Sequence, residues 1–190
     1  MASTQLNLWQ QELSDSTKMY VEAFGHLSSE ALNWKPQADK WSVGQCIDHI
    51  IVTNLTYIPI IEQSANKTYR HTFWQKMPFL PTFMGNMLLK TIAPSPTTKK
   101  VKTFQIFEPA TSQIADDILK QYQAHKAELS KVFAQTDKLN YEKIIISSPV
   151  NKYIIYSLKI AMDIVVAHEK RHFEQAKNVL AMYEKAVKNK

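Results

Sequence analysis

The chain has 190 residues and a formal net charge of +6, from 23 Lys or Arg and 17 Asp or Glu. This length suits a single domain over residues 1–190. Three glycines are few for an all-β or phosphate-cradling fold, and the single Cys excludes an internal disulfide. Residues 1–5 do not resemble a secretory signal, no apolar run is long enough to span a bilayer, and the lysines are spread along the chain. We therefore expect a cytoplasmic protein that binds neither membrane nor nucleic acid.

Four long helices are predicted from the apolar periodicity. They cover about Thr4 to Gly25, about Ser42 to Lys67, about Ser112 to Ala134, and Ser157 to about Ala186. Pro59 should kink or divide the second helix, because proline removes a backbone hydrogen bond. The inner face of the first helix is predicted to carry Leu6, Trp9, Leu13, Tyr20 and Phe24.

Two segments between these helices differ from them. Residues 68–110 are rich in proline and aromatic side chains, with a short helix predicted from about Phe83 to Thr91. This composition is typical of a segment that packs against a helical bundle. Residues Ile144–Val150 are expected to be extended. We therefore predict an all-α fold with a long insertion between its second and third helices.

The second helix has two apolar faces, and a helix that is apolar on two sides is covered on both. One of these faces carries Ile47, Ile51, Leu55 and Ile58. Either the insertion over residues 68–110, which crosses over from the second helix to the third, or a second subunit covers this face. We expect a homodimer to contribute.

His168 and His172 lie one turn apart on the inward-facing stripe of the fourth helix. A buried imidazole must satisfy both ring nitrogens. Coordination of one transition metal through one nitrogen and a hydrogen bond through the other would do so. The alternative is a chance pair of hydrogen-bonded core histidines.

His49 offers a third ligand. Ser42 and Gln45 form a capping-box pattern, so a helix should begin there and carry His49 about two turns inside. In a helical bundle this side chain can approach His168 and His172. Three histidine ligands leave an open coordination position, which is typical of catalytic rather than structural metal sites.

These motifs resemble the DinB-like superfamily of small metalloproteins. The resemblance lies in Trp41-Ser42-x-Gly44-Gln45-x-x-x-His49, followed by His168-x-x-x-His172-x-x-Gln175. It implies an antiparallel four-helix bundle with one long connection and a Zn²⁺ or Ni²⁺ site at His49, His168 and His172. Relatives of known activity include bacillithiol transferases and mycothiol-dependent maleylpyruvate isomerases. A low-molecular-weight thiol is thus an expected second cofactor.

Several side chains near these motifs have two interpretations. His168-Glu169-x-x-His172 also matches the zincin protease signature, but zincins take their third ligand from downstream of the motif. Glu169 instead either pairs with a Lys or hydrogen-bonds a ligand histidine, a role also open to Gln175. Cys46 and His125 are either additional ligands or buried core residues.

We expect a metal-dependent transferase or hydrolase that acts on a small molecule. Two alternatives stay open at this point. One is a non-catalytic stress-response or binding module whose metal is structural or absent. The other is a helical interaction protein in which the histidines are core residues.

Overall fold

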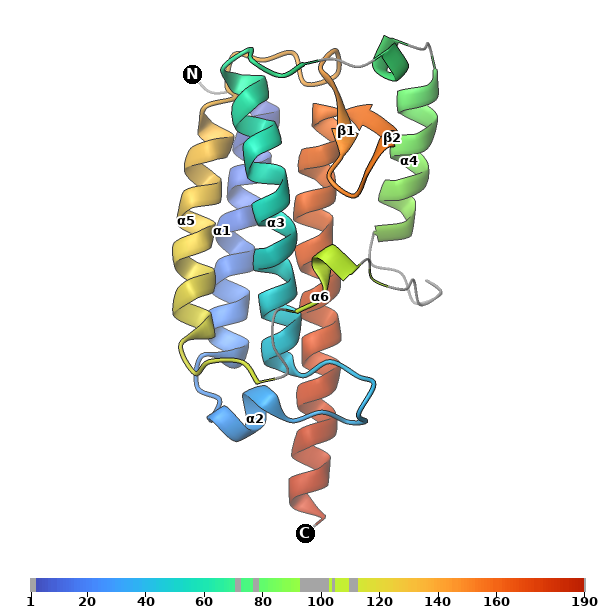
Figure 1. The fold of residues 1–190 in the computed structure, drawn as a ribbon. Helices are drawn as coiled ribbons and strands as arrows, with labels where there is room; N and C mark the ends of the chain where they lie inside the picture. Colours follow the sequence, from blue (N-terminus) through green and yellow to red (C-terminus); the bar gives the residue numbers. More distant parts are fainter. Residues whose placement is uncertain are drawn as a thin grey trace.

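The computed structural model describes residues 3–70, 73–76, 79–92, 103, 105–109 and 113–189. Four long helices pack side by side within these residues (Figure 1). They are α1 (Thr4–Phe24), α3 (Val43–Ala65), α5 (Ile118–Ala134) and α6 (Leu158–Lys188). Both α1 and α3 contact both α5 and α6, so the four helices close into a ring. The predicted four-helix bundle is confirmed.

The direction of the helices explains the long connection. In Figure 1, α1 and α6 run from top to bottom, whereas α3 and α5 run from bottom to top. Each of the pairs α1–α5 and α3–α6 is therefore antiparallel. Residues 66–117 return the chain from the upper end of α3 to the lower end of α5, as a bundle of this topology requires.

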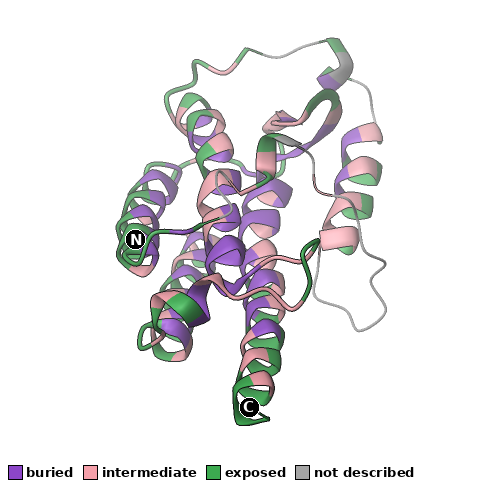
Figure 2. Cartoon of the chain, turned by 60° about the horizontal axis from the view of Figure 1, so that its bottom comes forward, coloured by how far each residue is buried: buried purple, intermediate pink, exposed green. Residues whose placement is uncertain are grey.

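The core lies between the four helices, where the buried residues concentrate (Figure 2). The predicted inner face of α1 is confirmed, because all five of its residues are buried. On α3, Ile47 and Ile58 are buried within the single chain, whereas Leu55 is 50% exposed. The homodimer stays a prediction. None of the described helices has the length and apolar character needed to cross a membrane.

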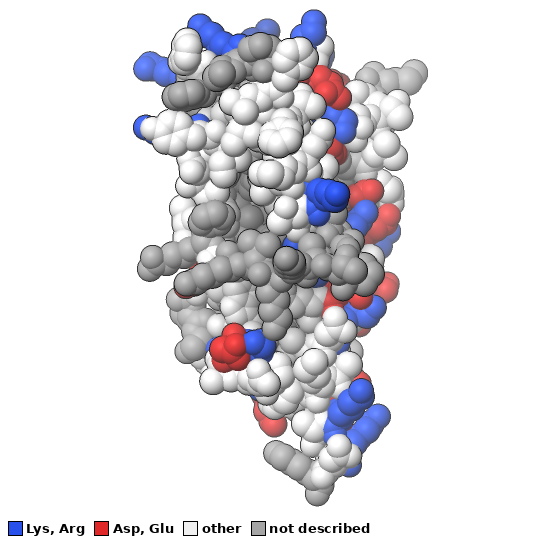
Figure 3. Space-filling model, turned by 90° about the vertical axis from the view of Figure 1, so that its right-hand side faces the viewer, with Lys and Arg blue, Asp and Glu red and all other residues white. Residues whose placement is uncertain are grey.

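The connection from α3 to α5 contains η1 (Phe73–Lys76), α4 (Leu80–Ile92) and η2 (Gln105–Phe107). The predicted short helix is thus α4, which packs on β2 and α6. Gly85 permits this contact, because a Cβ there would lie 2.8 Å from Cβ of Tyr156. Phe83 of α4 is exposed. The side of the molecule seen in Figure 3 is mostly uncharged in its upper part, apart from Lys and Arg along the top edge.

A β-hairpin precedes α6. It pairs β1 (Ile145–Ser148) with β2 (Asn151–Ser157) in antiparallel register, with Ile145 opposite Ser157. The extended segment predicted over 144–150 corresponds to β1 and the turn, whereas β2 was not predicted. Ser157 ends β2 and caps α6, because its hydroxyl accepts a hydrogen bond from the backbone N–H of Ile160.

Helix α5 begins later than predicted. The predicted start near Ser112 lies outside the described residues, and the helix starts at Ile118. The side chain of Asn33 binds both backbone groups of Ile114: it accepts from the N–H at 2.7 Å and donates to the carbonyl at 3.0 Å. These hydrogen bonds hold residue 114 outside the helix.

The structure differs from the prediction at two further places. Pro59 does not divide α3, which continues to Ala65. Pro59 is exposed, so its ring and the backbone carbonyl it leaves without an intrahelical partner face away from the core. A short helix, α2 (Ser29–Asn33), was not predicted; Ser28 caps it.

Candidate metal centre

The three histidines come from the two helices α3 and α6. The capping box is confirmed: the Ser42 hydroxyl accepts from the N–H of Gln45, whose side chain accepts from the N–H of Ser42. It fixes the start of α3 and places His49 in the second turn. On α6, which packs against α3, His168 and His172 lie one turn apart.

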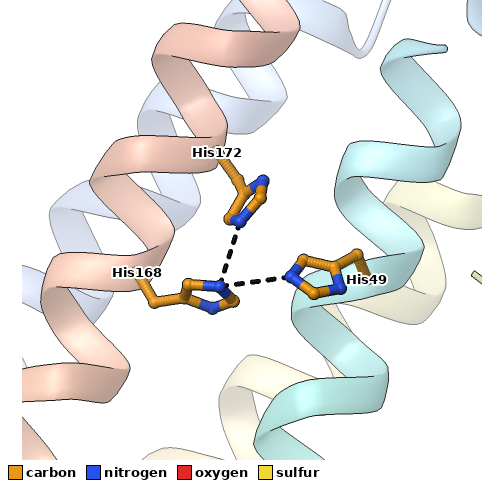
Figure 4. Close-up of side chains that lie close together, drawn as sticks. All are labelled: His49, His168 and His172. Carbon is orange, nitrogen blue, oxygen red and sulfur yellow. Dashed lines mark hydrogen bonds between the residues drawn. The ribbon is translucent and has the colours of Figure 1, made fainter. Parts of the chain in front are cut away.

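The ring nitrogens of these histidines converge (Figure 4). Nε2 of His168 lies 3.2 Å from Nε2 of His49 and 3.0 Å from Nε2 of His172. One proton on His168 can satisfy only one of these two contacts. Tetrahedral ligands at 2.0–2.1 Å from a Zn²⁺ ion would have nitrogens separated by about 3.3 Å. The observed spacing therefore fits a shared cation.

Nδ1, the ring nitrogen of His49 that points away from the other histidines, is held by the connection from α3 to α5. Nδ1 of His49 hydrogen-bonds the backbone carbonyl oxygen of Phe107 in η2. Because a carbonyl only accepts, Nδ1 carries the proton and Nε2 presents its lone pair to the other histidines. Metal-binding histidines commonly have this arrangement, with the second nitrogen donating to a backbone or carboxylate oxygen.

Burial keeps the cluster neutral. His49 and His172 are 3% and 6% exposed, and Nδ1 of His168 is buried without a hydrogen-bond partner among the described residues. Desolvation lowers the pKa of His49 to about 4, against a smaller opposing effect of the bond to Phe107. Desolvation and neighbouring positive groups lower the pKa of His168 and His172 well below the usual range. Each imidazole is therefore uncharged at neutral pH and has one ring nitrogen without a proton, as metal binding requires.

Trp41 forms one wall of the cluster. Its ring centroid lies 4.7 Å from that of His49, and it stacks on His172 at 5.9 Å. Sequence reasoning gave Trp41 no contact with the site, although its position just before the cap of α3 was a usable signal. The carbonyl of Phe107 offered no such signal, since any residue supplies one.

Arg171 lies beside the cluster and also joins two helices. Its guanidinium donates a 2.6 Å hydrogen bond to the carbonyl of Thr91, near the end of α4. Its positive charge lowers the pKa of all three histidines. The Gln175 side chain opposes this fall at His172.

Glu169 follows His168 in the sequence but does not bind the histidine cluster. Its carboxylate pairs with Lys126 of α5 and accepts hydrogen bonds from Ser16 of α1 and Asn54 of α3. No hydrogen bond joins it to a histidine ring within the described residues. Since the third histidine also comes from upstream, on α3, the arrangement differs from that of a zincin.

Cys46 and His125 lie outside the cluster. The group of possible ligands found among the described residues contains only the three histidines. Cys46 is fully buried, and burial raises the pKa of its thiol to about 12, so it stays protonated. His125 is buried on α5, and desolvation lowers its pKa.

Comparison with known proteins adds a family to this geometry. The model of the DinB superfamily matches residues 12–176, a range that includes α3 with His49 and both histidines of α6. No curated protein and no solved structure matches the chain. The match covers well over half of the chain and most of the four-helix bundle. The chain therefore belongs to the DinB superfamily.

Proposed function

We propose that the protein is a metal-dependent enzyme that acts on a small molecule through a divalent transition metal bound by His49, His168 and His172. The observation that carries the proposal is the convergence of the three rings: Nε2 of His168 lies 3.2 Å from Nε2 of His49 and 3.0 Å from Nε2 of His172. Zn²⁺ and Ni²⁺ both suit imidazole ligands.

The ligand set supports catalysis rather than a purely structural role. Among the described residues, no fourth His, Cys, Asp or Glu joins the three histidines. Of the residues that the structure does not describe, His71 is the only one of these four types. A divalent metal with three protein ligands keeps a position for water or substrate and lowers the pKa of the group bound there.

The chain's own residues would prepare this position. The carbonyl of Phe107 orients His49, and Trp41 shields the rings of His49 and His172 from solvent. Arg171 adds a positive charge that favours an anionic group at the site. A thiolate substrate meets this requirement. Thiol-dependent transfer is therefore our first proposal for the reaction, with hydrolysis as the alternative.

The test uses untagged protein purified without an immobilised-metal column. Elemental analysis should give about one metal per chain, and His168→Ala should lose it. The Co²⁺-substituted protein is then mixed with a small thiol such as 2-mercaptoethanol. A new sulfur-to-cobalt charge-transfer absorption would support an open, thiol-accepting position.

Two outcomes would change the proposal. Bound Co²⁺ with an exchangeable water but no thiol absorption would favour hydrolysis over thiol transfer. Absence of metal after incubation with Zn²⁺ or Ni²⁺ would overturn the enzyme proposal and favour a helical binding module.

A further inference from the structure

A buried carboxylate connects all four helices of the bundle. Glu169 of α6 is 0% exposed, and its carboxylate accepts hydrogen bonds from one or two side chains of each of the other three helices. Ser16 Oγ of α1 donates to Oε2 at 2.7 Å, and Asn54 Nδ2 of α3 donates to Oε1 at 3.2 Å. From α5, Tyr122 donates to Oε2 at 3.3 Å and Lys126 forms an ion pair with it.

The backbone at this position is also bound. The hydroxyl of Tyr20, on α1, donates a 3.0 Å hydrogen bond to the main-chain carbonyl of Glu169. Tyr20 is fully buried, and Lys126 is 3% exposed. Position 169 is therefore held by both its side chain and its main chain, directly beside the metal-site residue His168.

Stability alone is a weak explanation for these buried polar contacts around Glu169. Removing two charges from water costs several kcal/mol per ion, and apolar residues of similar size often replace a buried ion pair at no cost. Apolar packing is not directional, so it permits a helix to rotate against its neighbours. Hydrogen bonds are directional, and a carboxylate with donors on three helices keeps all of them in only one rotational orientation of α6.

The geometry of the metal centre depends on this rotational orientation of α6. An imidazole Nε2 lies on the order of 6 Å from its helix axis, so rotating the helix by about 10° moves the nitrogen by roughly 1 Å. Metal sites tolerate deviations of about 0.2 Å in ligand distance. Small rotations of α6 would therefore move His168 and His172 out of register with His49.

We propose that Glu169 is a positioning residue for the metal centre. Its contacts with Ser16, Asn54, Tyr122 and Lys126 hold α6 in the rotational setting that directs His168 and His172 at His49. This inference rests on the metal site of the proposed function. It gives the buried contacts of Glu169 a role other than stability.

The main test replaces both members of the ion pair by apolar residues of similar length, Lys126→Met with Glu169→Met. The measurements are helix content by circular dichroism, Co²⁺ affinity by chelator competition, and the Co²⁺ d–d absorption spectrum. We expect a helical protein whose metal affinity falls about tenfold to a hundredfold and whose spectrum changes. A folded double variant with wild-type affinity and spectrum would overturn the proposal.

Tyr57→Phe is the matched control. It breaks another buried contact between side chains, the 3.0 Å hydrogen bond between the hydroxyls of Tyr57 and Tyr156. It should lower thermal stability and leave both Co²⁺ signals unchanged. If the double variant does not fold, Ser16→Ala removes a single donor to Glu169. A few-fold loss of affinity in Ser16→Ala, absent from Tyr57→Phe, supports the proposal, and equal affinities overturn it.

A wild-type protein without metal affinity would overturn the metal site but would still permit a test of Glu169. Ring NMR signals of His168 and His172 then report the contacts between histidines in the metal-free protein. Changed signals in the Met double variant, with unchanged signals in Tyr57→Phe, support the positioning role. Unchanged signals in both overturn it.

Discussion

Nδ1 of His49 lies 2.5 Å from the backbone carbonyl oxygen of Phe107, and this hydrogen bond joins helix α3 to the crossover segment. The two residues are 58 positions apart in the sequence. Because the carbonyl accepts, the bond selects the tautomer in which Nε2 is free of a proton. The connection that leaves the end of α3 thus folds back along this helix and orients the ring of His49.

The tautomer of His49 can be observed directly. In a long-range ¹H–¹⁵N spectrum of the metal-free protein, Nδ1 of His49 should have the shift of a protonated nitrogen and Nε2 that of an unprotonated one. Adding Zn²⁺ should move the Nε2 signal far more than the Nδ1 signal. A proton on Nε2 of His49 in the metal-free state would contradict the assignment.

Each of the three histidines should be required for metal binding. Replacing His49, His168 or His172 by Ala leaves two ligands, and we expect at least a hundredfold loss of Zn²⁺ affinity in competition titrations. His125→Ala is the control, since His125 is buried on α5 outside the cluster. Unchanged affinity in any of the three cluster variants would refute the ligand assignment.

The metal-free protein should lose stability as the pH falls below about 6.5. The pKa of His49 is about 4 in the folded protein, and a histidine in an unfolded chain has a pKa of about 6.5. Between these values the unfolded state binds more protons, so acid favours unfolding. The lowered pKa values of His168 and His172 act in the same direction. The stability is complete above pH 6.5 and is lost towards pH 4.

Urea unfolding at several pH values measures this loss. Each histidine of the cluster should contribute about 1.4 kcal/mol per pH unit within its window. His49→Gln should give a shallower dependence than wild type. His26→Gln, at an exposed position, should give the wild-type slope. A free energy of unfolding that stays constant from pH 7 to pH 5 would show that the histidines are not buried in neutral form.

Gly85→Ala should destabilise the protein although alanine favours helices. The added Cβ would lie 2.5 Å from Cδ1 of Ile160 and 2.8 Å from Cβ of Tyr156, and the second atom cannot move without the backbone of β2. We expect a net loss of about 1–2 kcal/mol after the gain in helix propensity of up to about 1 kcal/mol. Thermal unfolding measures it, with exposed Asn86→Ala on the same helix as the control. An increase in melting temperature would contradict the close packing of α4.

Much of the candidate site could be predicted because its histidines follow helical spacing. His168 and His172 differ by four positions on an apolar stripe, and the Ser42–Gln45 pattern fixes where α3 begins and hence where His49 lies. The four long helices followed from the same periodicity. Local patterns were sufficient wherever a residue's role depends on its own helix.

Features that depend on distant partners could not be predicted in this way. The start of α5 depends on hydrogen bonds from Asn33 to Ile114, 81 positions away. Pairing of Glu169 with a lysine was one of two predicted alternatives, but the partner, Lys126, lies on another helix, where a lysine is normally read as solvent-exposed. Its place one turn after buried Tyr122 was the available signal. Nothing in the sequence marks the Phe107 carbonyl.

The order in which the histidines occur along the chain has a consequence for biosynthesis. His49 precedes His168 by 119 positions. While the ribosome is still making the segment before α6, the growing chain offers one imidazole of the three, and a single imidazole holds a divalent ion only weakly. At the proposed site, metal capture would therefore be a step of maturation, on a chain that has already released α6 and folded it against α3.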